Sequence, residues 1–196
     1  MNNKNIFFYI LIIFLALFIY GTIKAITIVN KREVSTNDGI YKNYVSTSNE
    51  IKTLSHNLTK NSNNKLEKVS ILLDYVTNIP YKTKLFQQSK PLQTIQQNFG
   101  DCDDKSNLLI SMLHSLGIEA YLVLVPKHIF VIVALGDNRL SDIQGLWIDG
   151  KKYYILETTA KGSNIGFELK YKINQIDTII EPFSNKKLDY NRLEFR

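Results

Sequence analysis

The chain has 196 residues and a formal net charge of +6, with 44% hydrophobic and 21% charged residues. This length gives room for one ordinary domain plus an appendage, with a core that needs no disulfides. The lysines are scattered and form no dense basic block with interleaved aromatic residues, so we predict no nucleic acid partner. The single cysteine, Cys102, cannot form an internal disulfide and is free to react.

An apolar run without charged residues extends from Ile6 to Ile23 and is followed by Lys24. At about 1.5 Å per residue the run spans roughly 27 Å, close to the ~30 Å hydrocarbon core of a bilayer. Residues 25–29 extend it if Lys24 snorkels to the headgroups. The sequence therefore predicts a single-pass transmembrane anchor over residues 1–29.

A cleaved signal peptide is the alternative interpretation of this run. The small-residue candidates for a cleavage site, Gly21 and Ala25, have Ile19 and Ile23 two residues upstream instead of small side chains, which favours an uncleaved anchor. The charges around the run slightly favour a cytoplasmic domain, whereas a very short inside tail is commonly followed by an exported domain. We expect the domain on the extracytoplasmic side of the membrane.

Residues 30–65 are rich in Asn, Ser, Thr and Lys and contain few large apolar side chains. This composition predicts a polar linker that precedes a domain at residues 66–196. Val45, Ile51 and Leu54 leave open a short helix that packs against the domain.

Two helices are predicted at the start of that domain. Apolar residues at positions 66, 69, 72, 73 and 76 recur at helical spacing and indicate an amphipathic helix over residues 66–77. A second, short helix is expected over residues 91–98, where Pro91 suits a first helical turn. A surface loop joins the two.

Cys102 lies at the predicted start of a third helix. Gly100 begins a turn that leads into the cysteine, and an apolar pattern then continues to Leu116 and ends at Gly117, a typical C-cap residue. Unpaired backbone N–H groups and the helix dipole stabilise a thiolate at such a position. Cys102 is therefore the candidate nucleophile.

After the third helix the pattern changes to strands. Residues 120–125 and 129–135 are apolar and rich in Val and Ile, and Pro126-Lys127-His128 joins them. Residues 146–148 and 152–156 flank Asp149-Gly150, a strong hairpin signal. Helices followed by an antiparallel sheet predict an α+β fold.

A thiol nucleophile needs a base, and the base needs a group that holds its ring. Of the three histidines, His56 lies in the polar stretch and His114 lies about 18 Å of helix rise from the thiol. His128 opens the strand that follows the cysteine helix and is the remaining candidate base. Antiparallel pairing can set Glu157, at the end of a later strand, beside it to orient the imidazole.

Four motifs occur in one order along the chain: Gly100-Asp101-Cys102-Asp103-Asp104, Leu116-Gly117-Ile118, Pro126-Lys127-His128-Ile129-Phe130 and Tyr153-Tyr154-Ile155-Leu156-Glu157-Thr158-Thr159. Together they resemble a prokaryotic transglutaminase-like protein with a papain-like core, over roughly residues 66–169. The resemblance implies helices packed on an antiparallel sheet and a thiol triad of Cys102, His128 and Glu157. It also implies action on protein or peptide amide bonds, as a cysteine peptidase or an acyltransferase.

The chain departs from the family pattern in two ways. The third triad member is usually aspartate, although some relatives carry the same Glu-Thr-Thr form. The separation 157 − 128 = 29 is also longer than the compact pattern, because residues 137–150 are inserted, and this loop is a candidate wall of a substrate groove. Since the family includes members without demonstrated chemistry, a catalytically inert binding or assembly module at the membrane is the alternative function.

Three aspartates, Asp101, Asp103 and Asp104, flank the cysteine. Nearby anions raise the pKa of a thiol, whereas the ordinary role of such residues is helix capping. Some similar cysteine proteases bind calcium with acidic residues beside the nucleophile. The sequence has no loop of spaced oxygen ligands, so we predict no metal or other cofactor and keep calcium as the alternative.

Overall fold

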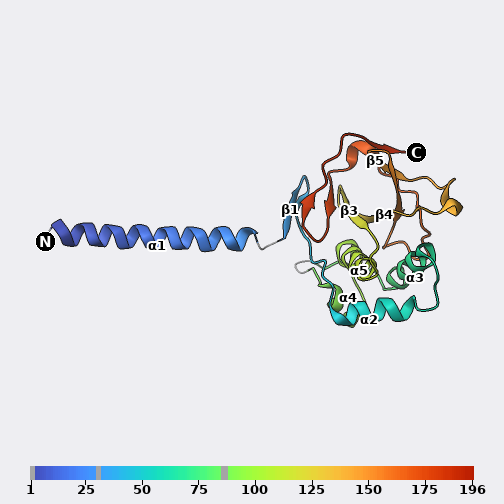
Figure 1. Ribbon diagram of the computed structural model, residues 1–196, viewed down its shortest axis with the longest axis horizontal. Helices are drawn as coiled ribbons and strands as arrows, with labels where there is room; N and C mark the ends of the chain where they lie inside the picture. The colour runs from blue at the N-terminus through green and yellow to red at the C-terminus, as the bar shows by residue number, and fades with distance from the viewer. Residues whose placement is uncertain (1–2, 30–31, 85–87) are drawn as a thin grey trace. The chain divides into compact units, whose positions relative to one another are not determined.

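A computed structural model of the chain describes residues 3–29, 32–84 and 88–196, and for residues 3–7 and 24–29 it describes the backbone alone (Figure 1). The chain divides into two compact units, of which the first ends at Glu33 and the second runs from Val34 to Arg196. The second unit holds all the motifs singled out from the sequence.

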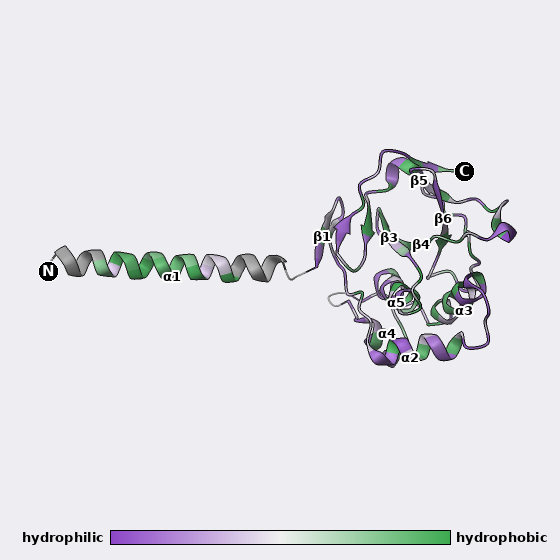
Figure 2. Ribbon diagram, in the orientation of Figure 1, coloured by the Kyte–Doolittle hydropathy of each residue, from purple (hydrophilic) through white to green (hydrophobic). Residues whose placement is uncertain are grey.

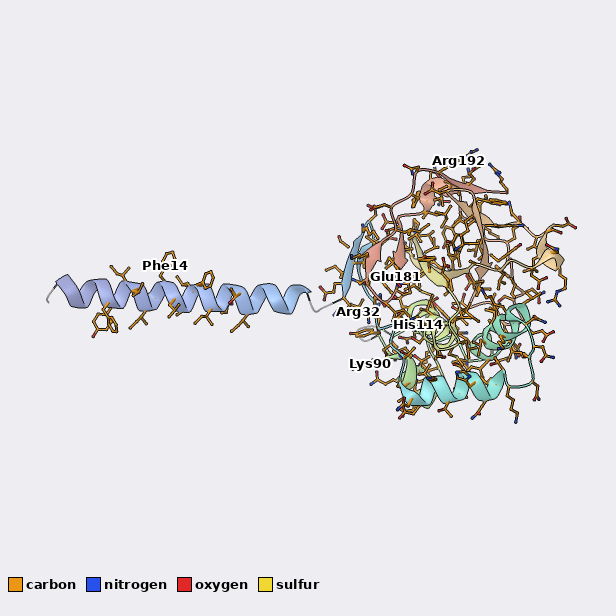
Figure 3. The ribbon with its side chains drawn as sticks, viewed as in Figure 1. Phe14, Arg32, Lys90, His114, Glu181 and Arg192 are labelled. Carbon is orange, nitrogen blue, oxygen red and sulfur yellow. The ribbon has the colours of Figure 1, made fainter. Side chains whose placement is uncertain are left out.

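The first unit is a single long helix, α1 (Asn3–Val29). Its described side chains are largely hydrophobic (Figure 2) and project on all sides of the helix (Figure 3), so that Phe14 is 72% exposed. Within the described part of the chain, no helix combines the length and the apolar character needed to cross a membrane. The anchor predicted for residues 1–29 is not found among the described residues, and residues 1–2 of that prediction lie outside them.

The helices of the second unit agree with the predicted ones to within about two residues. Asn64 caps α3 by accepting a hydrogen bond from the Glu67 backbone, Pro91 opens α4, and Gly117 follows α5 with a positive φ of 70°. The short helix that the sequence left open occurs as α2, which contains Ile51 and Leu54 and precedes the other three. Their bounds are α2 (Asn49–Leu58), α3 (Lys65–Thr77), α4 (Pro91–Gln97) and α5 (Cys102–Ser115).

The strands form a two-stranded hairpin and a seven-stranded sheet with the order β8-β7-β3-β4-β6-β5-β9. The described pairings are antiparallel, and Asp149-Gly150 makes the turn between β5 and β6. The predicted α+β class is confirmed. The bounds are β1 (Glu33–Thr36), β2 (Gly39–Lys42), β3 (Ala120–Val125), β4 (His128–Val133), β5 (Leu146–Ile148), β6 (Lys151–Leu156), β7 (Thr178–Glu181), β8 (Lys186–Lys187) and β9 (Leu193–Phe195), with short 3-10 turns η1 (Asn138–Leu140) and η2 (Ile173–Gln175).

Both faces of the sheet are buried, which explains the continuous apolar runs of its central strands. On β4, Ile129, Val131 and Val133 belong to the core shared with the helices, whereas Phe130 and Ile132 belong to the core on the opposite face. Helices α2–α5 cover the first face, as Figure 1 shows. Partly buried side chains from the segment 167–195 cover the second face.

Most of the stretch predicted as a polar linker, residues 30–65, folds with the domain instead. The second compact unit begins at Val34, and α2 occupies the middle of the stretch. The apolar residues are few but spaced so that they enter the helical core, where Val34, Tyr41, Val45 and Ile51 are at most 6% exposed. The low average hydrophobicity of residues 30–65 therefore did not indicate that some of them are core residues.

Helix α5 is the centre of the helical layer, and one of its buried residues is a lysine. α5 packs against α2, α3, α4, β3 and β4. Lys105 is 1% exposed and donates hydrogen bonds to the carbonyls of Thr77, at 3.3 Å, and Ile79, at 2.8 Å, at the end of α3. Burial lowers the pKa of Lys105 to about 8, although nearby Glu157 acts in the opposite direction.

The lowered pKa of Lys105 makes stability depend on pH. An unfolded lysine titrates near pH 10.4, so between about pH 8 and that value the unfolded chain binds more protons and the free energy of unfolding rises with pH. We expect Lys105→Met to reduce this rise, by on the order of 1–2 kcal/mol between pH 8 and pH 10, in urea unfolding. The exposed Lys52 provides the control Lys52→Met, and an equal pH dependence in both variants would contradict the prediction.

Gly100 allows a close approach of the chain to α5. Its backbone bonds to Pro80 and Lys82, and a Cβ at this position would lie 2.8 Å from the Cβ of Asp104. We expect Gly100→Ala to lower the free energy of unfolding by about 1–3 kcal/mol, measured by urea unfolding, because an added atom must displace α5. Gly136→Ala, where no atom lies within 4 Å of the added Cβ, should change it by less than about 0.5 kcal/mol.

Candidate active site

Cys102 is the first residue of α5, as the sequence predicts. Asp101 caps the helix, since its side chain accepts a hydrogen bond of 3.1 Å from the Asp104 backbone N–H. The cysteine is half-buried. Its backbone N–H lies in the first helical turn, where N–H groups have no carbonyl partner within the helix.

Strand pairing brings His128 and Glu157 together. In the β4–β6 register Val131 faces Leu156, so Glu157 lies level with Phe130, on the same face as His128 and diagonal to it. The imidazole Nε2 of His128 lies 2.7 Å from Glu157 Oε2. This contact occupies Nε2 and leaves Nδ1 for another partner.

Glu157 is held as a carboxylate. Burial raises its pKa, but hydrogen bonds from His128 and from the backbone and hydroxyl of Thr159 outweigh burial and lower the pKa overall. The side chain is 4% exposed, whereas that of His128 is 16% exposed. The Tyr171 ring lies nearly parallel to the His128 imidazole, with the two ring centroids 6.1 Å apart.

Ser106 joins the cysteine helix to both strands. It lies one helical turn after Cys102, and its hydroxyl contacts the Ile129 carbonyl at 3.4 Å and the Thr158 hydroxyl at 3.3 Å. These two partners are the chain neighbours of His128 and Glu157. One buried hydroxyl therefore fixes the elements that carry the three predicted site residues.

The thiol of Cys102 is neutral in this arrangement. Burial raises its pKa, and the charges of Asp103 and Asp101 raise it further, while a backbone hydrogen bond from Ile129 acts in the opposite direction. The Ile129 contact also places the sulfur beside the residue that follows His128. The expectation that a helix N-terminus favours a thiolate is thus outweighed here by burial and the acidic flank.

A cavity of about 600 Å³ opens over Cys102 and His128. It is lined by residues 36–41, 102–103, 124–129 and 174–177. The loop 137–150, expected to form a groove wall, does not line it. The β1–β2 hairpin and η2 supply the walls instead, and their polar sequences gave no signal of this role.

Three hydrogen bonds hold the hairpin over the cavity. Lys127, with a positive φ of 58° in the β3–β4 turn, donates its backbone N–H to Asp38 at 2.7 Å. The Asn37 backbone N–H donates to Asp177 at 3.0 Å, and its side-chain amide bonds to the same carboxylate. The turn that delivers His128 therefore also anchors the opposite wall.

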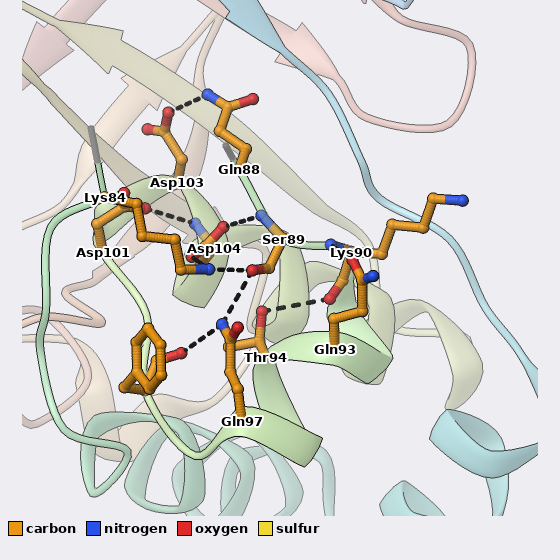
Figure 4. A network of polar contacts seen from close by, with 11 residues as sticks. Lys84, Gln88, Ser89, Lys90, Gln93, Thr94, Gln97, Asp101, Asp103 and Asp104 are labelled. Carbon is orange, nitrogen blue, oxygen red and sulfur yellow. Dashed lines mark hydrogen bonds and ion pairs between the residues drawn. The ribbon is translucent and has the colours of Figure 1, made fainter. Parts of the chain in front are cut away.

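The acidic flank of Cys102 is bound by a polar network from the α3–α4 connection (Figure 4). Lys84 forms an ion pair of 2.9 Å with Asp104, whose other oxygen accepts from the Ser89 backbone N–H. Gln88 donates its amide to Asp103. Nothing in the sequence pattern links this connection to the cysteine, so the prediction missed it.

The three aspartates do not converge on a common point that would suit calcium. Asp101 caps α5, Asp104 binds Lys84 and Ser89, and Asp103 binds Gln88 and the thiol. Among the described residues, no group of three or more His, Cys, Asp or Glu side chains is placed to hold a metal ion. The three carboxylates are thus engaged in hydrogen bonds and an ion pair within the domain.

The other histidines lie away from the thiol, as expected. His114 occupies the last turn of α5 and stacks on Phe183 at 3.6 Å. His56 lies in the last turn of α2.

Three solved structures are similar to this chain, with TM-scores of 0.50 or less. A candidate cysteine protease from Cytophaga hutchinsonii has a TM-score of 0.50 and 15% identity, over 78% of this chain and 53% of that chain. A candidate protease from Parabacteroides distasonis has a TM-score of 0.47 and 17% identity, over 76% and 29%. Legionella pneumophila LapG has a TM-score of 0.38 and 13% identity, over 62% and 77%. No curated protein matches the chain.

The chain spans about half the length of the Cytophaga structure, and at this identity the likeness shows the fold alone. The family model described as the transglutaminase-like superfamily matches residues 52–133, from within α2 to the end of β4. This stretch includes Cys102 and His128. The resemblance inferred from the motifs is thereby confirmed for residues 52–133, which match the transglutaminase-like superfamily model.

Proposed function

We propose that the domain is a thiol enzyme that acts on protein or peptide amide bonds through Cys102, His128 and Glu157. The observation that carries this proposal is the 2.7 Å contact of His128 with Glu157, on an imidazole that lines the same cavity as the only cysteine. The description of the Cytophaga relative as a candidate cysteine protease supports peptide amides as the substrate class.

The proposed reaction has two halves. In the first, a bond forms between Cys102 Sγ and the substrate carbonyl carbon while the thiol proton passes to His128 Nδ1. The carbon–nitrogen bond then breaks, and His128 returns the proton to the leaving amine. In the second half, water or another amine attacks the thioester, releases the acyl group and restores the thiol.

Two further groups assist these steps. Glu157 fixes the imidazole with Nε2 toward itself and stabilises the imidazolium that forms when His128 accepts the proton. The Cys102 backbone N–H, in the first turn of α5, is the candidate donor to the carbonyl oxygen as it becomes an oxyanion.

Acylation by p-nitrophenyl acetate tests the triad without knowledge of the natural substrate. We expect the full chain to release p-nitrophenol and to carry one acetyl group on Cys102, seen by intact mass, and Cys102→Ala to carry none. Loss of the base should slow acylation about 100-fold or more in His128→Ala, with a smaller effect in Glu157→Gln. His56→Ala is the matched control, and equal rates in the two histidine variants would overturn the proposal.

A binding module without catalysis is the second candidate function, and the raised pKa of Cys102 favours it. Complementation of a deletion strain with Cys102→Ala separates the two. If the domain is an enzyme, the variant should fold, as judged by circular dichroism, and fail to complement. Full complementation would instead assign the function to binding.

A further inference from the structure

Asp103 is the protein side chain that accepts the thiol proton. Cys102 Sγ lies 3.5 Å from Asp103 Oδ1, in the geometry of a sulfur donor and a carboxylate acceptor. Gln88 donates its amide to the other carboxylate oxygen, so the acceptor is held in this orientation. Asp103 also lines the cavity, and a group that binds there meets the thiol and the carboxylate together.

A thiol has one proton and directs it to one acceptor at a time. While Asp103 accepts that proton, His128 does not, and the first step of the proposed reaction cannot begin. A thiolate beside Asp103 would also face a negative charge in a half-buried setting, where charges interact more strongly than in water.

We propose that Asp103 is a positioning residue that holds the Cys102 proton and keeps the nucleophile in a neutral resting state. This inference rests on the proposed function, because a resting state has meaning only for a thiol that reacts. Gln88 takes part by fixing the carboxylate.

The groups around Asp103 determine the pH range in which it holds the Cys102 proton. Burial and the charge of Asp101 raise the pKa of Asp103 to about 6, while hydrogen bonds from Cys102 and Gln88 act in the opposite direction. Above about pH 6 the Asp103 carboxylate is therefore charged and accepts the proton of the Cys102 thiol. The charged and titratable groups that surround this pair are Asp101, Asp104, Lys84, His128, Glu157, Tyr81 and Tyr171.

The pH profile of alkylation by iodoacetamide tests the proposal, because only the thiolate reacts and the chain has a single cysteine. In Asp103→Asn we expect the midpoint of the alkylation rate to fall by at least about one pH unit. The rate at pH 7.5 should then rise about tenfold. Asp142→Asn removes one carboxylate charge from an exposed position and is the matched control.

Gln88→Ala provides a second variant that keeps the charge of Asp103 and releases its orientation. We expect an alkylation midpoint between those of the wild type and Asp103→Asn. The inference is wrong if Asp103→Asn has the same alkylation midpoint as Asp142→Asn. If Asp103→Asn does not fold, an unchanged midpoint in Gln88→Ala would contradict the inference instead.

The outcome is independent of the acylation experiment. A shifted midpoint with no effect of His128→Ala on acylation would retain the link between Asp103 and the thiol and reject the triad. An unshifted midpoint with slow acylation in His128→Ala would reject the role of Asp103 and retain the triad.

Discussion

The buried hydroxyl of Ser106 is the contact on which the geometry of the site depends. It lies on a helix whose residues from Asp104 to Leu113 are all buried, so α5 has no freedom to rotate without breaking the core. Its partners, Ile129 and Thr158, each adjoin a site residue. The position of the thiol relative to the imidazole and its carboxylate is thus set by packing between a helix and two strands, and not by a flexible loop.

Much of this arrangement could be predicted from the sequence, because the signals are local or follow from strand pairing. The apolar spacing after Cys102 indicated α5, and Asp149-Gly150 indicated the β5–β6 turn. The diagonal contact between His128 and Glu157 follows from two neighbouring antiparallel strands, although their register could not be read from composition.

The parts that the sequence did not reveal depend on contacts between distant segments. Val34 and Ile51 lie in polar surroundings, and only the folded domain shows that they are core residues. The bonds of Gln88 and Lys84 to the acidic flank join residues 15 or 20 positions apart through an irregular connection that has no periodic pattern. The cavity wall also depends on a contact between distant segments, because the hairpin that forms it lies more than 60 residues before the cysteine.

The β1–β2 hairpin is attached to the domain independently of the residues that hold the thiol and the imidazole. Residues 36–41 precede the stretch matched by the family model, which begins at residue 52, and they are tied to the cavity mainly by the Asn37–Asp177 and Asp38–Lys127 contacts. Insertions or substitutions at its tip can reshape one wall while Ser106 and the buried helix keep the thiol and imidazole in place. The cavity wall and the positions of Cys102 and His128 are therefore held by separate contacts, so the wall can change in shape without displacing the thiol or the imidazole.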